Sequence, residues 1–101
     1  MTRFNWKNKG NTGDRNCKCG SWRNHWLNYT GTTSWPTICS VDGCNNEPSL
    51  GGHVYQVDDG KEYIVPLCDS CNKRSDVFDL RGSISLARAN KSETCEKYRL
   101  F

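Results

Sequence analysis

The chain has 101 residues, of which 35% are hydrophobic, and its mean hydropathy of -0.82 leaves little apolar material for an ordinary core. Its seven cysteines therefore indicate a small domain stabilised by disulfides or metal ions. No apolar run resembles a signal peptide or approaches the roughly 20 residues that cross a bilayer, so we expect an intracellular (cytoplasmic or nuclear), metal-binding chain that is neither secreted nor membrane-bound. The formal net charge of +3 counts the cysteines as neutral and falls to zero if all seven bind two zinc ions as thiolates, so it indicates no partner.

The first part of the chain, residues 1–16, is polar, interrupted by glycine and without a clear period. We therefore expect a flexible N-terminal arm there and a single zinc-binding domain over residues 17–101. Further along, residues 27–37 are rich in β-branched and turn residues, which predicts a short strand after Gly31 that ends before Pro36.

A cluster of soft ligands opens the predicted domain: Cys17, Cys19 and His25. Three ligands are one short of a closed zinc site, and Cys95 from the far end of the chain would complete it and tie both termini to the core. Two alternatives stay open: His53 is the fourth ligand, or His25 is a packed side chain that binds no metal. If zinc does not fill this site, the Cys17–Cys19 pair indicates a redox or metal-handling role.

Two cysteine pairs flank the middle of the chain, and their members are Cys39, Cys44, Cys68 and Cys71. The first pair bounds CSVDGC, a tight loop in which backbone amides can point at the sulfurs. The second pair has the two-residue spacing typical of two thiolates at the start of a helix. The spacing predicts one structural zinc held by all four, and the alternative of two disulfides conflicts with the reduced compartment.

The sequence predicts a β-hairpin between the cysteine pairs. Apolar and polar side chains alternate in residues 53–57, residues 58–60 form a turn, and the chain returns over residues 62–66. A short helix should follow through Ser75. Residues 76–82 read as an exit turn packed on the hairpin. Residues 84–89 fit a strand slightly better than a helical face.

Over residues 39–75, the cysteine loop, the hairpin with a histidine on its first strand, and the string VPLCDSCN resemble the HNH (ββα-metal) endonucleases, in their zinc-bearing treble-clef form of the phage Holliday-junction type. The resemblance implies a small zinc-stabilised α+β domain whose treble clef (zinc knuckle, β-hairpin, short helix) carries extra strands. In that family the four cysteines hold zinc, the histidine is a general base, and the asparagine after the last cysteine helps to hold a catalytic ion. These roles would fall to His53 and Asn72.

This chain departs from the family at Gly52, where the family usually has an acidic ligand for the catalytic ion. An imidazole and one amide carbonyl are a poor site for Mg²⁺ or Mn²⁺. The alternative roles are a packed histidine at position 53 and a helix-capping asparagine at position 72.

We therefore expect a non-catalytic zinc module that binds nucleic acid or another protein and has no evident small-molecule cofactor. An HNH-type endonuclease is the alternative. Four basic residues are the candidates for contact with nucleic acid: Lys73, Arg74, Arg81 and Arg88.

Overall fold

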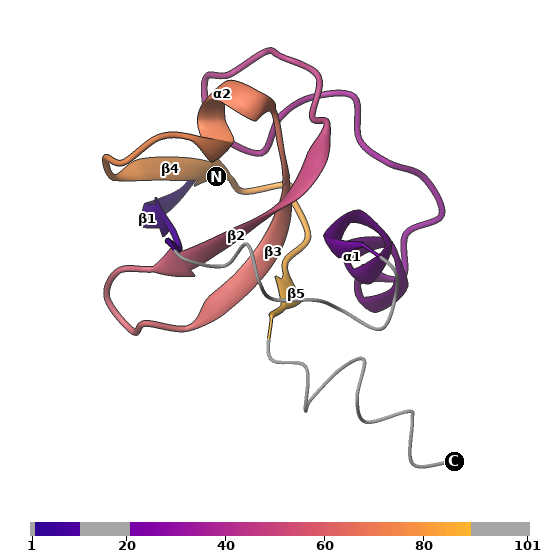
Figure 1. Cartoon of the computed structure of the whole chain (residues 1–101), viewed down its shortest axis with the longest axis horizontal. Helices are drawn as coiled ribbons and strands as arrows, with labels where there is room; N and C mark the ends of the chain where they lie inside the picture. Colours follow the sequence, from indigo (N-terminus) through magenta and orange to yellow (C-terminus); the bar gives the residue numbers. More distant parts are fainter. Residues whose placement is uncertain (1, 11–20, 90–101) are drawn as a thin grey trace.

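The computed structural model describes residues 2–10 and 21–89, which form a five-stranded antiparallel sheet with two helices (Figure 1). The elements follow the chain in the order β1 (Thr2–Asn8), α1 (Trp22–Thr30), β2 (Leu50–Gln56), β3 (Glu62–Leu67), α2 (Asp69–Asn72), β4 (Phe78–Arg81) and β5 (Ala87–Arg88). In space the strands lie in the order β4-β1-β2-β3-β5. The sheet thus joins both ends of the described chain to the central hairpin.

The predicted hairpin is present as β2 and β3, which are paired from Leu50 opposite Leu67 to Tyr55 opposite Glu62. Gly60, in the left-handed conformation at φ 73°, completes the turn between them. Because side chains alternate along a strand, Gly52 and Val54 face one side of the sheet and His53 and Tyr55 face the other. This alternation decides which candidate residues meet.

Strand β1 lies between β2 and β4, although the sequence analysis assigned its residues to a flexible arm. Trp6 is the only buried residue of this strand. The segment therefore lacks the alternation of apolar and polar side chains that predicts a half-buried strand. Its end is fixed to α2 because the Asn8 amide donates hydrogen bonds of 2.8 Å to the carbonyls of Cys71 and Arg74.

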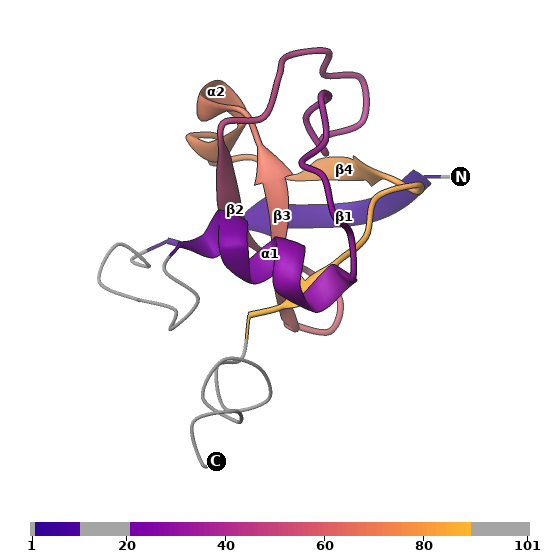
Figure 2. The same ribbon diagram turned by 90° about the vertical axis from the view of Figure 1, so that its right-hand side faces the viewer.

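Each face of the sheet carries a separate hydrophobic core. One core surrounds Trp6, Val54, Val65 and Leu80 and includes three of the central cysteines. The other lies under α1, which covers one face of the sheet in Figure 2. There Trp26 packs on Ile64, Ala87 and Ala89. Three tryptophans therefore fill the second core, as expected of a short chain with few aliphatic side chains.

Helix α1 occupies the region of the candidate ligand His25 and ends just before the segment in which the sequence analysis expected a strand. Ser21 caps its first turn by accepting a hydrogen bond from the Asn24 amide, and Gly31 ends it in the left-handed conformation. The chain from 31 to 37 forms no strand. The two caps were visible in the sequence, and with Trp22, Trp26 and Tyr29 at helical spacing they would have predicted the helix.

Strand β4 replaces the predicted exit turn, with Phe78 and Leu80 buried at alternate positions. The two-residue strand β5 agrees with the strand favoured for residues 84–89. Both outer edges of the sheet are occupied. Residues 40–42 bridge to β4 through Val41 and Leu80, and the His25 ring contacts the Arg88 carbonyl beside β5.

We predict that Gly51→Ala destabilises the domain by about 1–3 kcal/mol, because overpacking forces the backbone to move. A Cβ at position 51 would lie 2.6 Å from the carbonyl carbon of Trp22 and 2.8 Å from the Arg23 amide nitrogen, where α1 crosses β2. Denaturant unfolding of each purified variant measures the loss. The matched control is Gly10→Ala, where a Cβ meets nothing within 4 Å. Equal stability of the two variants would contradict the close packing of α1 on β2.

Candidate metal centre

The four central cysteines converge on one point: the Sγ atoms of Cys39, Cys44, Cys68 and Cys71 all lie within 4.8 Å of one another. The Cys44 and Cys68 sulfurs are 3.8 Å apart, which is about the separation of two thiolates in a tetrahedral zinc site with bonds of about 2.3 Å. Three of the four residues are buried and Cys44 is half-buried. The described residues thus provide a cluster that can hold a metal ion, and an all-sulfur set favours zinc.

Two short structures bring the sulfurs together. The first is the loop of residues 39–44, which we call the knuckle; it closes through a hydrogen bond from the Cys44 amide to the Val41 carbonyl, with Gly43 at φ 87°. The second is the start of α2, where Cys68 is the N-cap and Cys71 follows one turn later. The hairpin between them returns the chain to the knuckle, so a local spacing and one hairpin suffice to build the cluster.

Backbone amides point at the sulfurs from two elements: the Val41 amide of the knuckle hydrogen-bonds to the Cys39 sulfur, as the sequence analysis expected, and two further amides lie at the start of α2. The Cys68 amide lies 3.4 Å from the Cys39 sulfur, and the Cys71 amide lies 3.4 Å from the Cys68 sulfur. Asn46 also donates to Cys68 from its side-chain amide. These donors stabilise thiolate charge on two ligands before any metal is added.

The pKa values of Cys39, Cys68 and Cys71 are shifted in different directions. Burial alone would raise the pKa of Cys68, but hydrogen bonds from Ser70, Cys71 and Asn46 outweigh it and lower this pKa to about 6. Burial raises the pKa of Cys39, and burial together with the neighbouring sulfurs raises that of Cys71. Zinc must therefore displace protons from at least these two thiols, which makes metal binding weaker at low pH.

Arg81 holds the knuckle from the side of β4. Its Nε donates to the Cys39 carbonyl at 3.1 Å, and its Nη2 donates to the Cys44 carbonyl at 2.6 Å. A planar guanidinium can reach both carbonyls at once because its donors form a rigid fork. Arg81, a candidate nucleic-acid contact, therefore binds the knuckle instead. No spacing in the sequence indicated this structural role.

The other three basic candidates lie apart from one another in the fold. Lys73 forms an exposed ion pair with Asp69, and Arg74 forms a two-pronged ion pair with Asp76. Arg88 lies over the Tyr63 ring on β3. Contact of these residues with nucleic acid stays a prediction.

His53 lies on the α1 face of the sheet, next to the Trp22 ring and 5% exposed. Its Nε2 is 2.7 Å from a carboxylate oxygen of Glu62, which stands diagonally across the hairpin. The sequence analysis did not predict this pair, although a register that places His53 opposite Ile64 makes Glu62 a diagonal neighbour.

Asn72 belongs to the other face, beside Gly52. A Cβ at position 52 would lie 3.2 Å from the Asn72 side-chain oxygen and would overlap the Cδ1 atom of Leu67. The leucine thus fills the space that a side chain at position 52 would need. His53 and Asn72 are therefore not brought together, since adjacent strand residues point to opposite faces.

His25 is completely buried in α1, with its Nε2 2.6 Å from the Arg88 carbonyl. That short contact assigns the ring proton of the neutral tautomer to Nε2. Its proposed co-ligands Cys17, Cys19 and Cys95 lie outside the described residues, so the second zinc site stays a prediction.

Comparison with protein-family models, curated proteins and solved structures finds no match for this chain. A search of the described part of the chain for membrane-spanning helices finds none that is long and apolar enough. The cysteine cluster therefore carries the functional argument by its geometry alone.

We predict that Arg81→Lys weakens zinc binding about tenfold to 100-fold, the equivalent of losing one charged hydrogen bond worth about 1.5–3 kcal/mol. A lysine keeps the charge but cannot bridge two carbonyls in fixed geometry. Competition with a chromophoric chelator measures the affinity. Arg23→Lys is the control because Arg23 lies over Trp35 on the α1 face. Unchanged affinity in Arg81→Lys would show that the metal alone shapes the knuckle.

We predict that His25 makes the folded protein less stable as the pH falls. Burial lowers the pKa of His25 below its ordinary 6.5, and the hydrogen bond to the Arg88 carbonyl only partly offsets this. Below pH 6.5 the unfolded chain therefore takes up a proton that the folded chain refuses, at a cost of up to about 1.4 kcal/mol per pH unit. Above 6.5 the full stability is present.

The test compares the unfolding free energy of the wild type with that of His25→Gln, whose amide can still donate to the Arg88 carbonyl but does not titrate. The difference between them should shrink between pH 7 and the lower pKa of the folded state. A difference independent of pH would contradict the lowered pKa. A zinc count on the same variant tests the second site, which would lose one ion.

Proposed function

We propose that this chain is a zinc-stabilised binding module with a treble-clef core, and that its activity is the binding of a macromolecular partner. The supporting observation is the convergence of four cysteine sulfurs within 4.8 Å, two from a loop and two from a helix start on either side of a hairpin. The knuckle, the β2–β3 hairpin and α2 then make up the treble clef. The zinc ion has a structural role because all four of its positions are taken by sulfur.

The metal supplies what the apolar core lacks. A structural zinc contributes about 10 kcal/mol or more to folding, which is comparable with the whole net stability of an ordinary domain. Three of the ligands lie inside the core that surrounds Val54 and Leu80. The metal therefore acts as the centre of that core, and its removal unfolds the protein.

Two observations support a module without catalytic activity. Position 52 is a glycine, and the Leu67 side chain fills the space beside it. This position therefore supplies no second ligand that could hold a divalent ion together with Asn72. His53 is 5% exposed and lies on the opposite face from Asn72. A general base must reach a water molecule near the catalytic ion. A buried His53 on the face opposite Asn72 is poorly placed for this.

One observation favours the second candidate, an HNH-type endonuclease. The contact of 2.7 Å between His53 and Glu62 is the kind of pairing in which a carboxylate orients a histidine for proton transfer. We rank this function second because the pair is separated by the sheet from Asn72 and from the four sulfurs. The Cys17–Cys19 redox role remains the weakest candidate, and its residues lie outside the described ranges.

We predict that elemental analysis finds zinc in the purified protein and that Cys71→Ser loses one equivalent. A strong chelator should unfold the chain cooperatively, as followed by tryptophan fluorescence, because Trp6 and Trp26 lie in the two cores. Zinc, and not Mg²⁺, should restore the native signal. A chain that stays folded after complete removal of metal would disprove the structural role.

The same preparations separate the module from the nuclease. Incubation with supercoiled plasmid and Mg²⁺ or Mn²⁺ should give no nicking above a mock preparation, for the wild type and for His53→Ala alike. Nicking that disappears in His53→Ala, while the zinc content is unchanged, would establish the second candidate instead.

A further inference from the structure

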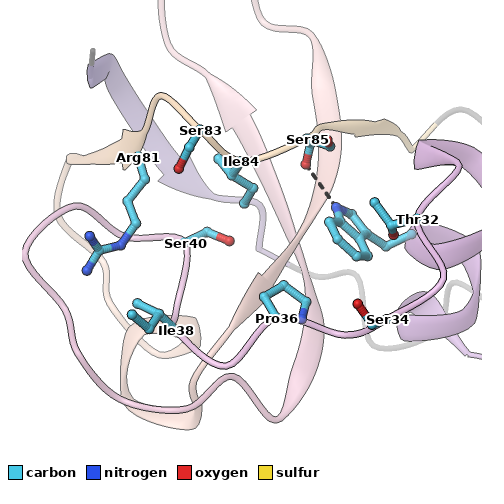
Figure 3. A pocket seen from close by; sticks show the side chains of 10 residues that line it. Thr32, Ser34, Pro36, Ile38, Ser40, Arg81, Ser83, Ile84 and Ser85 are labelled. Atoms are coloured by element: carbon cyan, nitrogen blue, oxygen red, sulfur yellow. Dashed lines mark hydrogen bonds between the residues drawn. The ribbon is translucent and has the colours of Figure 1, made fainter.

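A groove of about 310 Å³ runs between the loop of residues 32–40 and the segment of residues 81–85 (Figure 3). Its apolar side chains are Trp26, Pro36, Ile38 and Ile84. We call this cavity the Ile84 groove. Its volume is near the lower end of the range of ligand pockets, which is enough for a few atoms of a peptide but not for a large cofactor.

Hydroxyl groups line the polar part of the Ile84 groove. Ser34, Ser83 and Ser85 are exposed, and their side chains form no hydrogen bond with the protein within residues 2–10 and 21–89. Figure 3 shows Ser34 and Ser83 on opposite walls, with Pro36 and Ile84 between them. A hydroxyl can donate and accept, so these walls match the alternating N–H and C=O groups of an extended backbone.

The groove carries one charged side chain, Arg81, and no carboxylate lines it among the described residues. Figure 3 shows the guanidinium at the far end from Thr32 and Ser34. There Arg81 already donates to two knuckle carbonyls, next to a zinc–thiolate cluster that would carry negative charge. Little positive potential therefore remains for a phosphate, and the lining is complementary to an uncharged ligand.

Other described parts of the chain already bond to groups on both edges of the sheet. On the β4 side, the Ser40 carbonyl accepts from the Arg81 amide, and the Asp42 amide donates to the Asp79 carbonyl. On the β5 side, the Arg88 carbonyl is in contact with the His25 ring. A partner strand cannot pair with the groups that are already bonded, which favours a groove over a sheet edge as the place for a peptide.

The knuckle and the residue before it form one wall of the groove. Ile38 is 45% exposed and directly precedes the ligand Cys39. Ser40, next along the knuckle, is held by hydrogen bonds from its amide (3.0 Å) and its hydroxyl (2.5 Å) to the Pro66 carbonyl. This wall is therefore continuous with the loop that carries the candidate ligands Cys39 and Cys44.

We infer that the Ile84 groove binds an extended, uncharged peptide segment of a partner protein, with one apolar side chain seated on Pro36, Ile38 and Ile84. The inference rests on the proposed function and gives that module a partner of the protein class. The three serines bond the peptide backbone, and the apolar floor selects the anchoring side chain. A nucleic-acid strand is disfavoured because Arg81, the one cation among the lining residues, already donates to two knuckle carbonyls.

The experiment selects ligands from a phage library of random linear peptides on the immobilised, zinc-loaded full chain. Selected peptides should share one Leu, Ile, Met or Phe flanked by uncharged residues, and their amide shifts in two-dimensional NMR should map to residues 34–40 and 83–85. Ile38→Asp should weaken their binding by about tenfold or more, because one apolar contact is replaced by a charge. Ser83→Trp, which fills the groove from an exposed position, should do the same.

Val77→Asp is the matched control, since Val77 is 48% exposed and does not line the groove. All variants are first checked for zinc content and thermal unfolding, so that loss of the fold is separated from loss of the site. Three results would overturn the inference: no peptide maps to the groove, the peptides are predominantly acidic, or a random single-stranded oligonucleotide perturbs the same residues. If the zinc count and chelation behave as predicted, such a result leaves the binding module intact and removes only this partner.

Discussion

The convergence of four sulfur atoms is the interaction on which the rest of this structure depends. It joins a loop to a helix of only four residues, and neither would hold its shape alone, because a single turn of helix is unstable in water. From this point contacts spread outward: Arg81 connects the knuckle to β4, and Asn8 connects α2 to β1. Strands β1 and β4 are thus fixed through the two elements that carry the four cysteines.

The two faces of the sheet have separate tasks, and Gly51 and Gly52 show why. At position 51 the backbone of α1 approaches so closely that no Cβ fits. At position 52, on the other face, the Leu67 side chain fills the place that a Cβ would take. Two adjacent glycines therefore let a helix and a leucine pack against one strand from opposite sides. A carboxylate at position 52 would require the buried Leu67 side chain to move. The absence of a side chain at position 52 is accordingly tied to how the core is built.

Local features of the sequence predicted the centre of the fold. The cysteine pairs and the alternating hairpin are separated by short spacings, so their geometry follows from the chain itself. Strand β1 was missed because its pairing with β2 and β4 is non-local and because Asn5, at φ 68°, interrupts its alternation. Helix α1 was missed because His25 was assigned to metal binding before the caps at Ser21 and Gly31 were considered. The hydrogen bonds from Arg81 to the Cys39 and Cys44 carbonyls join residues far apart in the sequence, so no local pattern predicts them.

Metal binding and partner binding are coupled if the Ile84 groove acts as inferred. Ser40 and Arg81 belong both to the groove and to the hydrogen bonds that hold the knuckle, so a peptide that requires the ordered wall binds only the folded, zinc-loaded state. Linkage then requires that the partner raise the affinity for zinc by the same factor by which zinc raises the affinity for the partner. A module of this kind would be most resistant to loss of metal while it is bound to its partner.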